Sequence, residues 1–161
     1  MIGIGDKAFE LAVFIGSRQP LDKYMALNTL QPVEEGSLAD MVVLTGNHWR
    51  KIINIYAKLG FGLNSAGYSS WQNYRDSYLL TKHSKQALLF DGYPTTRERK
   101  CINIICGKTY AATLLKGSVL SHYDDDFSIN VENRIIVTPY FDYRQLSNLK
   151  LDKLIGLVRN L

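Results

Sequence analysis

The chain has 161 residues, of which 46% are hydrophobic and 21% charged, with a formal net charge of +4. This length and apolar content predict one domain, residues 1–161, that builds its core without disulfides or a structural metal. The N-terminal segment carries Asp6, Lys7 and Glu10 instead of a basic region followed by an apolar run, so we expect no secretory signal and a cytoplasmic location. No span approaches the roughly 20 apolar residues of a membrane helix.

Four short apolar runs predict strands that are buried on both faces. They comprise residues 11–16, 87–90, 102–106 and 134–137. Runs without polar alternation are typical of a parallel sheet, because helices cover both of its faces.

Three segments between and after these runs have helical spacing. In residues 48–59, apolar side chains recur every three or four positions, and Gly60 is expected to end the helix. Residues 108–115 predict a second helix, and residues 149–161 a third that either Ser147 or Asn148 caps.

The stretch 70–81 is rich in aromatic residues and fits a short helix or a strand. Alternating strands and helices predict an α/β fold, a three-layer sandwich around a mostly parallel sheet of about four strands. In such folds ligands bind outside the carboxyl ends of the strands.

Cys101 and Cys106 lie in one predicted strand at an odd spacing, so their thiols point to opposite faces and cannot pair. We expect both to be reduced and buried. The three aspartates at 124–126 predict a solvated turn between strands rather than a metal site. The basic cluster of Arg97, Arg99 and Lys100 fits a solvated surface or a phosphate-binding patch.

Gly107, Lys108 and Thr109 join a predicted strand to a predicted helix, as in the last part of a phosphate-binding loop. The glycine that such a loop needs five residues earlier is replaced by Ile102, so nucleotide hydrolysis is not expected. Free backbone N–H groups and Lys108 predict an anion-binding site at this helix start.

Asn47, His48, Trp49 and Arg50 open the first strong helix, where the positive end of the helix dipole favours phosphate. The alternative is that Asn47 only caps the helix and Trp49 only packs.

A second polar and aromatic cluster, Tyr140, Phe141, Asp142 and Arg144, follows the last predicted strand. Its rings suit stacking on a base and its arginine suits a phosphate. The alternative is a packed loop with an internal Asp142–Arg144 ion pair.

Taken in order, the segments 13–20, 46–60, 104–115 and 135–146 resemble the uracil-DNA glycosylase superfamily, above all its compact bacterial and archaeal branch. The most convincing match is the strand at 104–106 followed by Gly107 and an alanine-containing helix. The resemblance implies the α/β fold of that superfamily. It does not extend to the catalytic residues, because Phe141 stands where the family has a histidine that donates to the departing anion, and Phe cannot donate a hydrogen bond.

We therefore expect a protein that binds single-stranded nucleic acid, a nucleotide or a nucleobase, with no cofactor and no metal. The expected cleft is formed by these residues: Arg18, Asn47, His48, Trp49, Arg50, Tyr140, Phe141 and Arg144. One alternative is a hydrolase acting on a base or nucleoside, in which Asp142 orients water and His48 donates a hydrogen bond. Another is an interaction protein without a small ligand, in which Arg18, His48 and Arg144 do not cluster.

Overall fold

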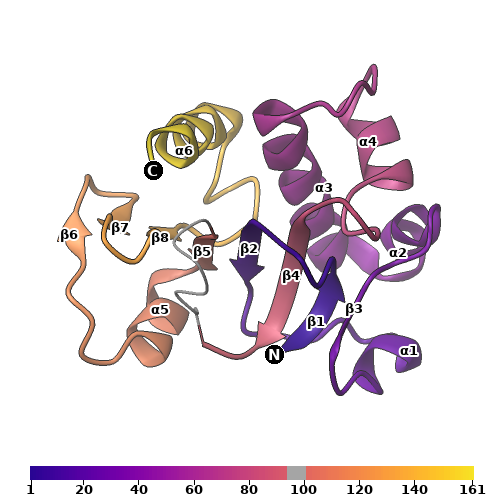
Figure 1. Cartoon of the computed structure of the whole chain (residues 1–161), viewed down its shortest axis with the longest axis horizontal. Helices are drawn as coiled ribbons and strands as arrows, with labels where there is room; N and C mark the ends of the chain where they lie inside the picture. Colours follow the sequence, from indigo (N-terminus) through magenta and orange to yellow (C-terminus); the bar gives the residue numbers. More distant parts are fainter. Residues whose placement is uncertain (94–100) are drawn as a thin grey trace.

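A computed structural model describes residues 1–93 and 101–161, and the basic cluster at 97–100 therefore lies outside the described residues. Within the described part, eight strands form one sheet with six helices packed around it (Figure 1). The strands are β1 (Ile2–Gly5), β2 (Leu11–Phe14), β3 (Leu30–Gln31), β4 (Gln86–Asp91), β5 (Ile102–Cys106), β6 (Ser121–His122), β7 (Ser128–Asn130) and β8 (Ile135–Thr138). The helices are α1 (Asp22–Met25), α2 (Ser37–Leu44), α3 (Gly46–Leu63), α4 (Trp71–Ser77), α5 (Lys108–Leu114) and α6 (Asn148–Asn160). The predicted α/β class is confirmed.

The sheet is mixed, with the strand order β3-β1-β4-β2-β5-β8-β7-β6. Its four central strands, β4, β2, β5 and β8, coincide with the four predicted runs and pair in parallel. β1 is antiparallel to β4, and β7 is antiparallel to both β6 and β8. The prediction of about four mostly parallel strands is thus wrong. Four further strands extend the sheet on both sides, namely the short β3, β6 and β7 and the glycine-containing β1, and none of them gives a clear apolar pattern in the sequence.

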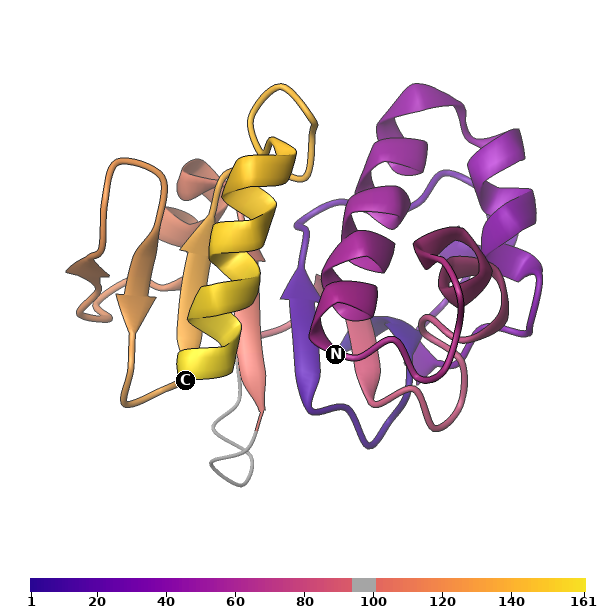
Figure 2. The same cartoon turned by 90° about the horizontal axis from the view of Figure 1, so that it is seen from above.

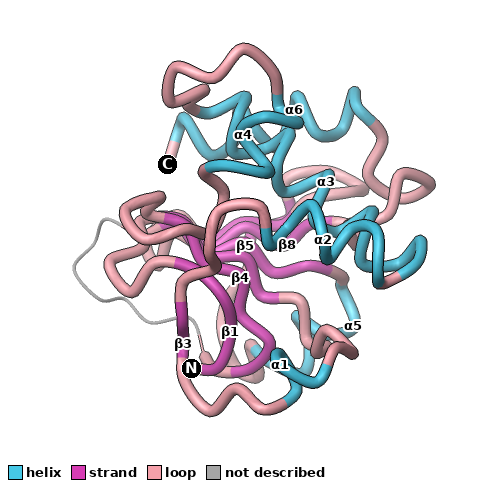
Figure 3. Tube along the Cα trace, turned by 90° about the vertical axis from the view of Figure 1, so that its right-hand side faces the viewer, coloured by secondary structure: helices cyan, strands magenta, loops and turns pink. Residues whose placement is uncertain are grey.

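Side chains alternate between the two faces of the central strands, as strand geometry requires. Val13, Leu88 and Ile104 belong to a core cluster shared with α2, α3, α4 and α6. Their neighbours Phe14, Leu89 and Ile105 belong to a second cluster shared with α5. The chain therefore forms three layers, with α2, α3, α4 and α6 on one side of the sheet and α5 on the other (Figures 2 and 3). The short α1 adds Tyr24 to the first cluster.

Helix α3 extends past Gly60, where the sequence predicts its end. The glycine is needed inside the helix because a Cβ atom there would lie 2.7 Å from Tyr74 Oη and 2.9 Å from Gln86 Nε2. Gly60 thus permits the close approach of α4 and β4 instead of stopping the helix.

The other ambiguous segments are settled by local hydrogen bonds. Residues 71–77 form a helix whose cap is Ser70, because its hydroxyl accepts from Asn73 N. At the start of α6 the capping residue is Ser147, whose hydroxyl accepts from Lys150 N.

Cys101 and Cys106 are free and buried, and they belong to the clusters on opposite faces, as predicted. Burial raises the pKa of the Cys101 thiol to about 11 and raises that of Cys106 further. In the part of the chain that the structure describes, no helix combines the length and the apolar character that crossing a membrane requires.

Candidate functional site

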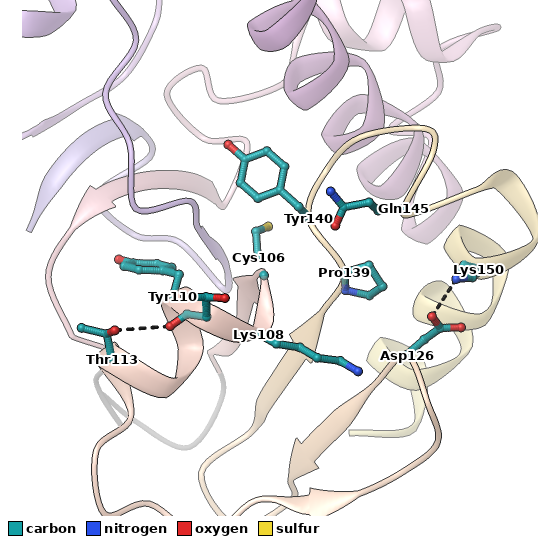
Figure 4. A pocket seen from close by; sticks show the side chains of 11 residues that line it. Cys106, Lys108, Tyr110, Thr113, Asp126, Pro139, Tyr140, Gln145 and Lys150 are labelled. Atoms are coloured by element: carbon teal, nitrogen blue, oxygen red, sulfur yellow. Dashed lines mark hydrogen bonds and ion pairs between the residues drawn. The ribbon is translucent and has the colours of Figure 1, made fainter.

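A pocket of about 780 Å³ lies at the carboxyl ends of β5 and β8 (Figure 4). Its lining includes Cys106 and Gly107, where β5 gives way to α5, and Pro139 and Tyr140, which follow β8. This is the edge of the sheet where α/β proteins bind ligands. We call it the edge pocket.

The turn from β5 into α5 forms one side of the edge pocket. Gly107 has a φ of 93°, which favours glycine, and its N–H donates to Thr138 O at 2.9 Å, so it ties this turn to β8. Lys108 and Thr109 also line the pocket. The structure therefore places the three predicted anion-binding residues together in the wall of one cavity.

A charged wall consists of Lys108, Lys150 and Asp126 (Figure 4). Lys150 Nζ, from α6, lies 2.6 Å from a carboxylate oxygen of Asp126. Lys108 Nζ donates to the backbone oxygen of Asp125 at 2.5 Å. Two ammonium groups and one carboxylate give this wall an excess of one positive charge.

The adjacent wall is aromatic and apolar, with Tyr110, Tyr140 and Pro139. The Tyr110 ring packs against Gly16, where a Cβ atom would lie 2.7 Å from the ring. Burial raises the pKa of both tyrosines, and the Ser17 hydroxyl beside Tyr140 opposes that rise. Both phenols therefore stay protonated at neutral pH.

His48, at the start of α3, supports the Tyr140 side chain from outside the pocket. Its Nε2 atom lies 2.9 Å from Tyr140 Oη, and the two rings stack at 5.8 Å with planes 8° apart. His48 does not line the pocket, so its contact with any ligand there would act through Tyr140.

The carboxylate of Asp142 holds the loop after β8 through an ion pair and a backbone hydrogen bond. Asp142 accepts from Lys51 Nζ at 2.6 Å and from Arg144 N at 2.9 Å. The Lys51 ammonium lowers the pKa of this carboxyl below its usual value. The Asp142–Arg144 ion pair of the packed-loop alternative is replaced by this Lys51 pair, and Asp142 is not in the pocket lining.

The predicted arginines do not meet in one cleft. Arg18 donates to the backbone oxygens of Met25 and Leu27 at 2.8 and 3.1 Å and so holds its own loop. Arg50 donates to Asn47 on the surface of α3, and Arg144 is exposed. Beside the edge pocket, His48 of α3 contacts Tyr140, and Gly16 lies against the Tyr110 ring.

Two of the rings predicted to stack on bases are in the core. Trp49 is 3% exposed and packs edge-on against Phe90, and Phe141 is fully buried against Tyr56. The prediction that they contact a ligand is wrong, because both side chains face the sheet with the apolar residues of α3.

Sequence reasoning missed Tyr110, Asp126, Gln145 and Lys150, which also line the pocket. Asp126 belongs to the turn between β6 and β7, as predicted for the three aspartates, and within the described residues no group of acidic, His or Cys side chains could hold a metal ion. Tyr110 was one position beyond the predicted anion site. Gln145 follows Arg144 in the predicted loop after β8, and only Asp126 and Lys150 reach the pocket through long-range packing.

A family model described as a family of unknown function, DUF6942, matches residues 2–159. No curated protein and no solved structure gives a significant match to the chain. The resemblance to the uracil-DNA glycosylases therefore stays a prediction from sequence motifs.

Proposed function

The chain belongs to the DUF6942 family, and we propose that it binds a nucleotide or a nucleobase in the edge pocket. The observation that carries this proposal is the pocket itself, which pairs an aromatic wall with a positively charged wall at the carboxyl ends of β5 and β8. Its volume is within the range of typical small-molecule sites.

The two walls suit the two parts of a nucleotide. Tyr110 and Tyr140 offer ring surfaces for a flat heterocycle, and Pro139 adds apolar contact area. Lys108 and Lys150 offer ammonium groups for an anionic part. Gln145 can donate to and accept from polar groups at a base edge.

A free nucleotide or base is better supported than a nucleic-acid strand. Stacking along a single strand needs several accessible rings, and Trp49 and Phe141 are buried. The sequence-based expectation of strand binding thus lacks two of its proposed contacts.

The proposal does not extend to glycosidic-bond cleavage. The carboxylate of Asp142 is engaged by Lys51 and Arg144, and His48 faces Tyr140 rather than the cavity. Neither group lines the edge pocket in position to act on a bound ligand.

Isothermal titration calorimetry with a panel of free bases, nucleosides and nucleotides tests the proposal. We expect saturable binding at one site per chain for at least one member. Tyr140→Ala should weaken this binding, whereas Tyr143→Ala, a neighbouring tyrosine outside the pocket lining, should not. Absence of saturable binding across the panel, or equal loss in both variants, would contradict the proposal.

A further inference from the structure

The acidic turn at residues 124–126 faces three lysines from two helices. Lys153 pairs with the Asp124 carboxylate, Lys108 donates to the backbone oxygen of Asp125, and Lys150 pairs with the Asp126 carboxylate. Of the three aspartates, only Asp126 belongs to the lining of the edge pocket (Figure 4). Its carboxylate is thus an anion already bound within the charged wall.

In the ion pair between Lys150 and Asp126, a ligand anion can take the place of the Asp126 carboxylate. The two side chains are 36% and 33% exposed, and ion pairs with this degree of exposure contribute little to stability. A phosphate monoester is largely a dianion at pH 7.5, because its second pKa is near 6. Such a group attracts an ammonium more strongly than a single carboxylate does.

Resting on the proposed function, we infer that the ligand is a nucleoside monophosphate whose phosphate replaces Asp126 as the partner of Lys150. The heterocycle then lies toward Tyr110 and Tyr140, and the phosphate lies in the charged wall beside Lys108. Asp126 becomes a specificity-determining residue, because any anion that enters this wall must compete with its carboxylate.

The same charges limit the number of phosphates. Among the described lining residues, Lys108 and Lys150 are the cations, and Asp126 remains nearby with its negative charge. A second or third phosphate would add negative charge without a further cation in this lining. Affinity should therefore rise from nucleoside to monophosphate and not rise again to triphosphate.

Calorimetry at pH 7.5 and low salt, with adenosine, its monophosphate and its triphosphate and with the matching uridine series, tests this inference. In the wild type, the monophosphate of the preferred base should bind about tenfold or more tightly than the nucleoside, as expected for hydrogen bonds to a charged group. The triphosphate should bind no more tightly than the monophosphate.

Asp126→Asn removes the competing charge and keeps the side-chain size. It should raise monophosphate affinity by about three- to tenfold and leave nucleoside affinity unchanged. Asp124→Asn is the matched control, since Asp124 is on the same turn and pairs with Lys153 outside the pocket lining, and it should change neither affinity. Lys150→Ala should lower monophosphate affinity and leave the nucleoside unaffected.

The outcomes separate the two proposals. Equal binding of nucleoside and monophosphate, or weaker monophosphate binding by Asp126→Asn, would overturn the phosphate assignment while the base-binding function stands. No binding by any member of either series would overturn both. The wild-type series decides the phosphate assignment even if a variant fails to fold.

Discussion

Gly60→Ala is predicted to destabilise the protein, although replacing glycine by alanine within a helix usually stabilises it by about 1 kcal/mol. The new methyl group would lie 2.7 Å from Tyr74 Oη and 2.9 Å from Gln86 Nε2. These two atoms share a buried hydrogen bond of 2.6 Å. Backbone and side chains packed this closely must shift to admit the methyl group.

The magnitude follows from the opposing contributions. Overpacking a core costs about 1–3 kcal/mol, and disturbing a buried hydrogen bond costs about 1–3 kcal/mol more. Set against the helical gain of about 1 kcal/mol, the free energy of unfolding should fall by about 1–5 kcal/mol.

Urea unfolding followed by circular dichroism measures this change. Gly156→Ala in α6 is the matched control, because apart from its chain neighbours and the nearby backbone of its own helix nothing lies within 4 Å of the added Cβ atom. This control should be more stable than the wild type by about 0.5–1 kcal/mol. If Gly60→Ala is as stable as the wild type, the close approach of α3 to Tyr74 and Gln86 is not as described.

Three further predictions follow from burial, charge and contact. Native-state thiol titration should label Cys101 and Cys106 slowly, since burial raises both thiol pKa values, and rapid labelling of both would contradict this. The Lys153 ammonium lowers the pKa of Asp124 to about 2, so this pair stabilises the folded state above the unfolded carboxyl pKa of about 3.9 and loses its effect as the pH falls toward 2. Asp124→Asn should therefore lower the Tm at pH 7 and lower it much less near pH 2, where the carboxyl is about half protonated; an equal difference at both values would refute the pairing. His48→Ala should weaken calorimetric ligand binding about two- to tenfold, because the stacked and hydrogen-bonded support of the pocket tyrosine is lost, and unchanged affinity would show that this support is not needed.

The central strands and the long helices could be predicted because their signals are local. Each of the four predicted runs is short and mostly apolar, and the spacing in α3 is helical over many residues. β1 was missed because Gly3 and Gly5 weaken its strand pattern. These glycines are required by β4, since a Cβ atom on Gly3 would lie 2.3 Å from Leu88 O, a contact that local sequence does not reveal.

The difference between local signals and long-range contacts also explains which residues of the edge pocket could be predicted. Gly107, Lys108 and Thr109 were found because a strand, a glycine and a helix start follow one another directly in the sequence. Asp126 and Lys150 reach the pocket only because β7 pairs with β8 and α6 packs near the same edge. No periodicity or motif connects residues that meet in this way.

The wrongly assigned rings show where residue type alone misleads. Trp49 and Phe141 are chemically suited to stacking on a base, but apolar burial decides their orientation first. Trp49 occupies the buried stripe of α3 together with Ile52 and Ile53. An aromatic residue at a core position of a helix is thus better interpreted as packing than as part of a binding surface.

The most direct test of the edge pocket is chemical-shift mapping of the ¹⁵N-labelled protein during titration with a nucleoside monophosphate. We expect the largest backbone amide shifts at four residues that line the pocket, Lys108, Thr109, Tyr110 and Gln145. The amides around Arg18, whose side chain is engaged within its own loop, should move little. Shifts centred on another surface, or no shifts at saturating ligand, would contradict the assignment of this pocket as the binding site.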